Sequence, residues 1–152
     1  MKLLGIALVM GIIVPAPGGD VKAEAKKDLA ALQGEWNMVA GVNDGWSIPA
    51  EARAGAKRVC RGNETTVSMN GMLLMKAKFT LDPSKKPSAI DYHRTVGPKG
   101  PTTSDTIQRG IYEIHNGSVR FCFAETGKPR PTRFSSEKGS GWTLTRWKRS
   151  RG

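Results

Sequence analysis

The pair Asn116-Gly117 sets the strongest local constraint on the fold, because it lies in the middle of an alternating segment at residues 107–124. A two-residue hairpin turn needs positive φ at both central positions, and Asn and Gly adopt it at the lowest cost. The turn fixes the register of the two strands. The predicted pairs are Gly110 with Phe123, Tyr112 with Phe121, Glu113 with Arg120, Ile114 with Val119 and His115 with Ser118. One face is therefore apolar and aromatic and the other carries an ion pair, which is typical of a half-buried antiparallel sheet.

Short segments of alternating polarity, separated by Gly, Pro and Asn, fill the rest of the chain. We expect a short helix at residues 26–33, strands at 35–42, 57–61, 65–69, 72–81, 89–94, 132–135 and 142–148, and loops at 82–87, 95–105 and 125–131. In the first strand we expect one face to carry Trp36, Met38, Ala40 and Val42.

The second pair of this kind, Asn70-Gly71, gives a conflict of register. A strict two-residue turn pairs Val67 with Leu74, which puts Val67 on the face opposite Phe79. A β-bulge or a longer loop would remove the conflict, and both alternatives stay open.

The connections decide the architecture. No interior segment is long enough for the helix of a βαβ crossover, and most connections have the length of hairpin turns. A meander of eight or nine strands avoids exposed edges best by closing on itself. The sequence therefore predicts an all-β fold, a small antiparallel up-and-down barrel with a short N-terminal helix, and an open sandwich is the alternative.

Residues 1–23 are typical of a secretory signal peptide. Lys2 gives a short positive start, and residues 3–14 form an apolar run that is too short to span a bilayer. Small residues have the spacing of a cleavage site at 16–18 and at 21–23, and we favour the second because Pro17 lies within the first. We expect a signal peptide at 1–23, a single domain at 24–152 and a periplasmic or extracellular protein. An uncleaved membrane anchor is the alternative.

The chain is strongly basic, with a formal net charge of +11. Loss of Lys2, Lys22 and Asp20 with the signal peptide removes a net charge of one and leaves +10. Such a charge favours contact with polyanions, and for an exported protein nucleic acid is the least expected of them. A solvated basic surface without a specific partner is the simpler interpretation.

Cys60 and Cys122 are the only two cysteines. An oxidising compartment would allow a disulfide, but two positions in a sequence do not show that their Cα atoms come within about 7 Å. We interpret both as small buried or half-buried strand residues, with the disulfide as the alternative.

Several motifs together resemble a known family. They are LQGEW at residues 32–36, FTLDPSKKP at 79–87, AID at 89–91, GIYE at 110–113, FCFA at 121–124, and GKPRP at 127–131 leading to FSS at 134–136. In combination they are similar to the uncharacterised lipocalin-like domain family of planctomycete bacteria, over residues 32–149. The resemblance implies an exported lipocalin-like barrel and no reaction. Cys122 matches the family pattern, whereas Cys60 stands where an apolar residue is expected.

Two functions from different classes follow. The first is binding of a small apolar or amphiphilic ligand inside the barrel. The residues expected to line this site are Trp36, Phe79, Tyr112, Phe121 and Phe123. The second is an envelope interaction module that binds a partner protein or an anionic polymer through its basic surface, with a fully packed interior. Lys128, Arg130 and Arg133, in a proline-stiffened segment, are candidate anion contacts, although solvated charges explain them as well.

An enzyme is the least expected class. Asp91 and His93 share a strand face, but no third metal ligand is visible beside them, and the common catalytic and phosphate-binding motifs are missing from the sequence. We therefore expect a non-enzymatic protein with no metal and no cofactor.

Overall fold

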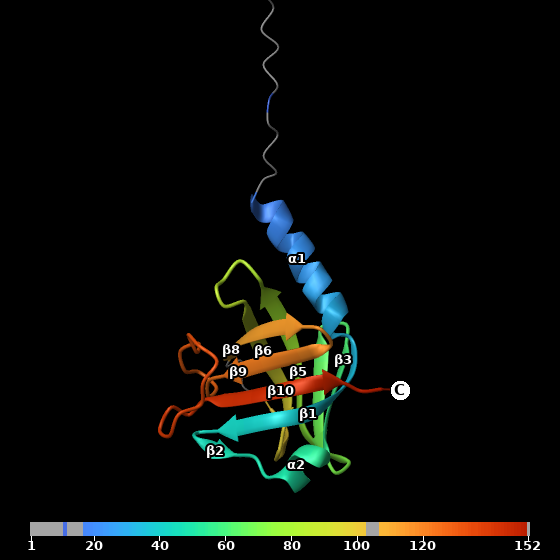
Figure 1. The fold of residues 1–152 in the computed structure, drawn as a ribbon, viewed down its shortest axis with the longest axis vertical. Coiled ribbons are helices and arrows are strands. Elements are labelled where there is room, and N and C mark those ends of the chain that lie inside the picture. The colour runs from blue at the N-terminus through green and yellow to red at the C-terminus, as the bar shows by residue number, and fades with distance from the viewer. Residues whose placement is uncertain (1–10, 12–16, 103–106, 152) are drawn as a thin grey trace, which may run out of the picture.

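The computed structural model describes residues 11, 17–102 and 107–151, and the side chains from residue 20 onward within the first helix. Eight antiparallel strands close into a barrel, which confirms the predicted all-β class and architecture. The strand order is β10-β9-β8-β6-β5-β4-β3-β1, and pairing of β1 with β10 closes the ring (Figure 1). The short strands β2 and β7 pair with β1 and β6.

The elements follow one another with short connections. They are α1 (Pro17–Leu32), β1 (Gly34–Asn43), β2 (Trp46–Ser47), α2 (Ala50–Ala54), β3 (Ala56–Arg61), β4 (Glu64–Met69), β5 (Met72–Asp82), β6 (Ala89–Gly97), β7 (Gly100–Pro101), β8 (Ile107–His115), β9 (Ser118–Phe123) and β10 (Thr143–Arg149).

The hairpin of β8 and β9 has the predicted register. Tyr112 pairs with Phe121 and Gly110 with Phe123, and the aromatic side chains face the core. On the outer face, Arg120 and Glu113 form the expected ion pair with an N–O distance of 3.0 Å. The positive φ angle of Asn116, 45°, is the conformation that the turn requires.

The conflict at Asn70-Gly71 is resolved by a β-bulge. Val67 pairs with Met75 and Ser68 with Leu73, so Leu74 is the extra residue on β5. The bulge keeps Val67 packed against the core together with Met75.

A second bulge in β1 corrects the predicted face of that strand. Met38 pairs with Trp147 and Ala40 with Arg146, so Val39 is the extra residue. Trp36 and Met38 face the core as expected, but the bulge turns Ala40 and Val42 to the outside of the barrel. Strict alternation across an uninterrupted strand could not show this reversal.

Three predicted boundaries also change. Residues 132–135 are not a strand but part of an irregular segment between β9 and β10. Residues 95–97 continue β6 instead of starting a loop, and residues 103–106 of that expected loop lie outside the described residues. The first helix begins at Pro17, nine residues before the predicted start at 26, and so runs through the favoured cleavage site.

Helix α1 covers one end of the barrel (Figure 1). Leu29 and Leu32 pack against the core, and the Trp36 indole Nε1 donates to the Leu32 carbonyl at 2.9 Å. Arg149, at the end of β10, places its guanidinium 4.4 Å from the Trp36 ring centroid and donates to the carbonyls of Ala31 and Gln33. First strand, last strand and helix are thereby joined at this end.

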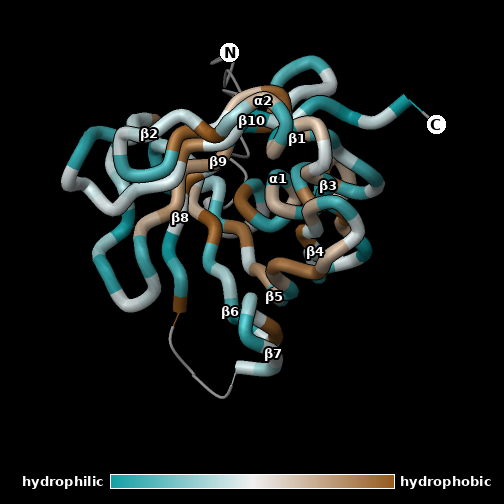
Figure 2. Tube along the Cα trace, turned by 90° about the horizontal axis from the view of Figure 1, so that it is seen from below, coloured by the Kyte–Doolittle hydropathy of each residue, from teal (hydrophilic) through white to brown (hydrophobic). Residues whose placement is uncertain are grey.

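The opposite end is bordered by α2 and by the turns after β1 and β4. Figure 2 looks along the barrel from this end, and α1 is visible through the ring of strands. Side chains fill the ring, and the most exposed members of the core are Met75 and Phe123, at 7% each.

Gly110 gives a direct test of the packing. An added Cβ would overlap the Phe123 ring and lie 2.9 Å from the Cys122 carbonyl oxygen. We expect Gly110→Ala to lower the free energy of unfolding by about 1–3 kcal/mol in urea titrations, because backbone and ring must both move. Gly97→Ala is the matched control, since its Cβ meets the Thr102 methyl group at 3.4 Å. Equal losses in the two variants would contradict the packing.

Candidate functional site

The five residues predicted to line a ligand site come together in the barrel interior. All of them are buried in one cluster, supplied by four strands: Trp36 from β1, Phe79 from β5, Tyr112 from β8, and Phe121 and Phe123 from β9. Phe121 and Phe123 stack with their ring centroids 5.9 Å apart, and Tyr92 joins the cluster with its ring centroid 4.2 Å from that of Phe123. The interior is therefore an aromatic core filled by its own side chains.

An arginine lies in the middle of this core. Arg58 is on the inward face of β3, between Ala56 and Cys60, and only 4% of its surface is exposed. Its guanidinium lies 4.6 Å from the ring centroid of Phe121 and 4.7 Å from that of Trp147. Aromatic faces attract such a cation, which partly offsets the loss of its hydration.

The hydrogen-bond partners of Arg58 are neutral. Nη1 donates to the Tyr92 hydroxyl at 2.6 Å and to Thr65 Oγ1 at 3.1 Å, while Nε is buried without a partner. Burial raises the pKa of Tyr92, against the opposing effect of the Arg58 charge, so this hydroxyl is not an anionic counter-charge. Among the described residues no carboxylate forms an ion pair with Arg58. An uncompensated buried charge is costly, which makes Arg58 a candidate contact for an anion.

A second arginine faces the same interior. Arg94 pairs with Ala77, a fully buried core residue of β5, and follows Ile90 and Tyr92 on the inward face of β6. It is half-buried, and its Nε also lacks a hydrogen-bond partner. Burial lowers the pKa of Arg94, while Tyr92 acts in the opposite direction. Two guanidinium groups therefore act on the same buried tyrosine.

Sequence reasoning missed both arginines. The segment 57–61 alternates basic and other residues on both faces, so Arg58 could not be told from its exposed neighbours Lys57 and Arg61. Arg94 stood at the expected end of its strand. The inward position of Tyr92 on the same strand was the available signal, because residues two apart share a face.

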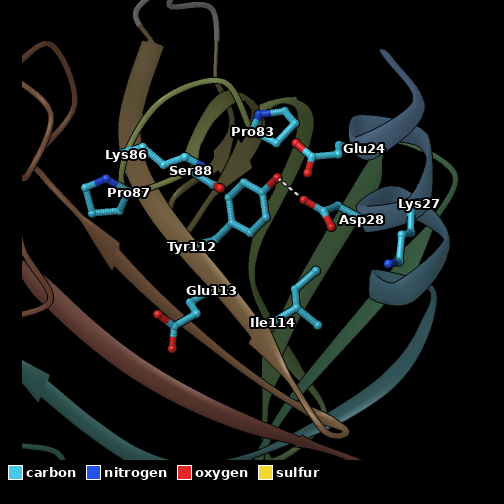
Figure 3. Close-up of a pocket in the computed structure, with 10 residues that line it drawn as sticks. All are labelled: Glu24, Lys27, Asp28, Pro83, Lys86, Pro87, Ser88, Tyr112, Glu113 and Ile114. Carbon is cyan, nitrogen blue, oxygen red and sulfur yellow. Dashed lines mark hydrogen bonds between the residues drawn. The ribbon is translucent and has the colours of Figure 1, made fainter. Parts of the chain in front are cut away.

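A groove of about 360 Å³ lies between α1 and the barrel (Figure 3). Its walls are the helix, the β5–β6 loop and β8, and its lining includes Glu24, Lys27, Asp28, Lys86, Ser88, Tyr112 and Glu113. The Tyr112 hydroxyl points toward the helix and donates to Asp28 Oδ2 at 2.6 Å (Figure 3). Burial raises the pKa of Tyr112, and the Asp28 charge adds to the effect. The groove is lined by charges of both signs. We therefore interpret it as the surface on which α1 packs against the barrel and not as a ligand-binding site.

The three candidate anion contacts do not converge. Arg130 Nη1 donates to the carbonyls of Ile90 at 3.1 Å and Gly110 at 2.8 Å, and it lies 2.8 Å from Asp91 Oδ1. Arg130 thus fixes the segment after β9 to the barrel wall. Arg133 pairs with Glu137 at 3.0 Å, and Lys128 is exposed.

The cysteines are free and buried. Cys60 faces the core, 3.5 Å from Thr65 Oγ1, and Cys122 lies on the outer face of β9, where it donates to the Ser135 carbonyl at 3.2 Å. Burial raises the pKa of the Cys122 thiol. Their placement agrees with the interpretation of both as small buried strand residues.

The described residues contain no candidate metal site and no candidate membrane-spanning helix. No three His, Cys, Asp or Glu side chains there are grouped as metal ligands, and Asp91 is engaged by Arg130. None of the helices in this part of the chain has the length and apolar character needed to cross a membrane.

Comparison with known proteins gave no relative. No family model matches the chain, and neither the curated proteins nor the solved structures provide a match. Function therefore has to be inferred from the residues and their geometry.

The contact between Tyr112 and Asp28 is testable through stability. We expect Tyr112→Phe to lower the free energy of unfolding at pH 7 by about 1–3 kcal/mol, because it removes a hydrogen bond to a charged acceptor. Lys26→Gln, at an exposed position of the same helix, is the control and should leave stability unchanged.

The same variant should alter the response to alkali. A tyrosine whose pKa is raised on folding stabilises the protein below its unfolded pKa, near 10, and this contribution is lost as pH rises further. The wild type should therefore lose stability above pH 10 more steeply than Tyr112→Phe. Parallel pH profiles in chemical denaturation would contradict this role of Tyr112.

Proposed function

We propose that this protein binds a small amphiphilic molecule inside the barrel and has no catalytic activity. The observation that carries the proposal is the guanidinium of Arg58, which lies in an otherwise aromatic interior without a carboxylate partner among the described residues. A core selected only for stability would place an apolar side chain there, because replacing buried charges by well-packed apolar groups is often stabilising. The presence of the charge in this core favours a role in binding.

The packed interior is the arrangement expected of the interaction module, so binding inside the barrel requires that side chains move. The end covered by α1 is fastened by Trp36, Leu32 and Arg149, so the opposite end is the expected entrance. Met75 and Phe123 are the most exposed core residues and belong to the half of the barrel nearer this end. The Met side chain is flexible and fills irregular space, so Met75 can change its conformation to admit a ligand.

The exposed surface around this end also suits an apolar ligand. Met72 and Leu73, at the β4–β5 turn, are 70% and 41% exposed. Large apolar side chains at the edge of a barrel can contact the part of a ligand that remains outside the interior.

Tryptophan fluorescence provides the test. Trp46 and Trp142 lie outside the core, so the double variant Trp46→Phe/Trp142→Phe leaves only the buried Trp36 and Trp147 as reporters. We expect saturable 1:1 energy transfer from these tryptophans to the neutral probe N-phenyl-1-naphthylamine, because a probe in the interior comes into contact with them. Transfer that does not saturate, or none at all, would contradict binding inside the barrel.

A second candidate function is an envelope interaction module. Trp46 is 65% exposed at the β1–β2 turn, next to Lys138, whose Nζ lies 4.6 Å from the ring centroid. An exposed aromatic beside a cation on a chain of net charge +11 favours anionic polymers or an acidic partner protein. Binding of this kind should weaken steeply with salt, whereas binding in the interior should not.

We also propose export through a signal peptide at residues 1–23 and membership of the lipocalin-like family of planctomycete bacteria. The α1 residues that contact the barrel support the cleavage site, since Asp28, Leu29 and Leu32 all follow it. N-terminal sequencing of the protein from its own envelope should begin at Glu24. An intact Met1 would contradict cleavage and favour a membrane anchor.

A further inference from the structure

We infer that the amphiphilic ligand carries a carboxylate, and that this carboxylate binds inside the barrel to Arg58 and Arg94. The inference rests on the proposed ligand-binding function and names the chemical class that it selects. Its basis is a pair of inward-facing guanidinium groups, each with a buried Nε that has no hydrogen-bond partner.

The position of Arg58 leaves donors for an anion. Its Nη1 holds Tyr92 and Thr65, and these two bonds orient the guanidinium between the rings of Phe121 and Trp147. The group is thus fixed before a ligand arrives. A fixed donor loses little conformational freedom on binding, which raises affinity.

The position of Arg94 completes the site. Arg58 donates to the Tyr92 hydroxyl at 2.6 Å, and Arg94 lies two residues after Tyr92 on the same inward face of β6. Arg94 is the more exposed of the two and lies on β6 toward the end opposite α1. A carboxylate that enters from this end meets Arg94 first and Arg58 deeper in the barrel.

A carboxylate fits the site better than a larger anion. Its two oxygens accept from two guanidinium groups in charge-assisted bonds. Its single charge also costs less to desolvate than the double charge of a phosphate monoester. An aliphatic tail would then point outward, past Met75 and Phe123 toward Met72 and Leu73.

A purely structural role for the arginines makes a different prediction. If stacking on Phe121 and Trp147 were the only purpose of Arg58, the barrel would bind an acid and the corresponding alcohol equally well. Dodecanoate and 1-dodecanol have the same tail and differ in the charged group, so their relative affinities separate the two roles.

The experiment is isothermal titration of the full mature protein with each probe below its aggregation concentration. We expect dodecanoate to bind about tenfold or more tightly than 1-dodecanol. Arg94→Gln should lower this preference several-fold without removing it, because one of the two cations is lost and Arg58 remains. Arg146→Gln, which removes the same charge from an exposed position on the outside of β10, should keep the preference.

Arg58→Met tests the deeper arginine, and a thermal melt shows whether it folds. Should it not fold, the Arg Nε–H resonances of the wild-type protein supply the test. Two of them should shift on addition of dodecanoate and stay in place with 1-dodecanol.

The outcomes separate the inference from the proposed function. Equal affinity of the wild type for the two probes, or a preference that is as large in Arg94→Gln as in the wild type, overturns the carboxylate site and leaves ligand binding intact. Failure of both probes to bind removes the ligand-binding function, and the carboxylate site with it.

Discussion

A positive charge enclosed by aromatic rings is the constraint around which the interior of this barrel is arranged. Arg58 of β3 is held by Tyr92 and Thr65 and stacked between Phe121 and Trp147, so side chains of β4, β6, β9 and β10 all contact one guanidinium. Such a group costs free energy when its charge is uncompensated, and aromatic contacts and neutral hydroxyls offset only part of that cost. A ligand that supplies the missing anion would offset the remainder.

The two ends of the barrel use arginine in contrasting ways. At the α1 end, Arg149 stacks on Trp36 and donates to the carbonyls of Ala31, in the last turn of the helix, and Gln33, just after it. This cation therefore stabilises the closed end of the barrel. Arg130 is similarly occupied by two carbonyls and Asp91. Arg58 and Arg94, by contrast, lie on the inward faces of β3 and β6, and neither forms an ion pair among the described residues. The proposed binding site rests on this difference and not on the net charge of the chain.

Local rules were sufficient for much of the fold and insufficient for the site. Asn116-Gly117 fixed one register, and with it the inward positions of Tyr112, Phe121 and Phe123, because a two-residue turn leaves a single pairing. The bulge at Val39 moves the side chains of Ala40 and Val42 from the predicted inward face to the outside of the barrel. This could not be predicted, because an extra residue leaves no mark in an alternating apolar sequence. Arg58 and Arg94 were missed for a related reason. Sequence patterns assign a charged strand residue to the solvent face, and only the three-dimensional structure shows that these two arginines lie on the inward face of the barrel.

Native mass spectrometry of the protein, purified without denaturation from the organism that produces it, tests the central claim most directly. We expect a complex with one small molecule per chain, which is released on denaturation and is identified after extraction as a carboxylic acid with an apolar tail. A clean apo mass, together with no uptake of added acid, would contradict ligand binding and leave Arg58 as a packed structural cation in an interaction module.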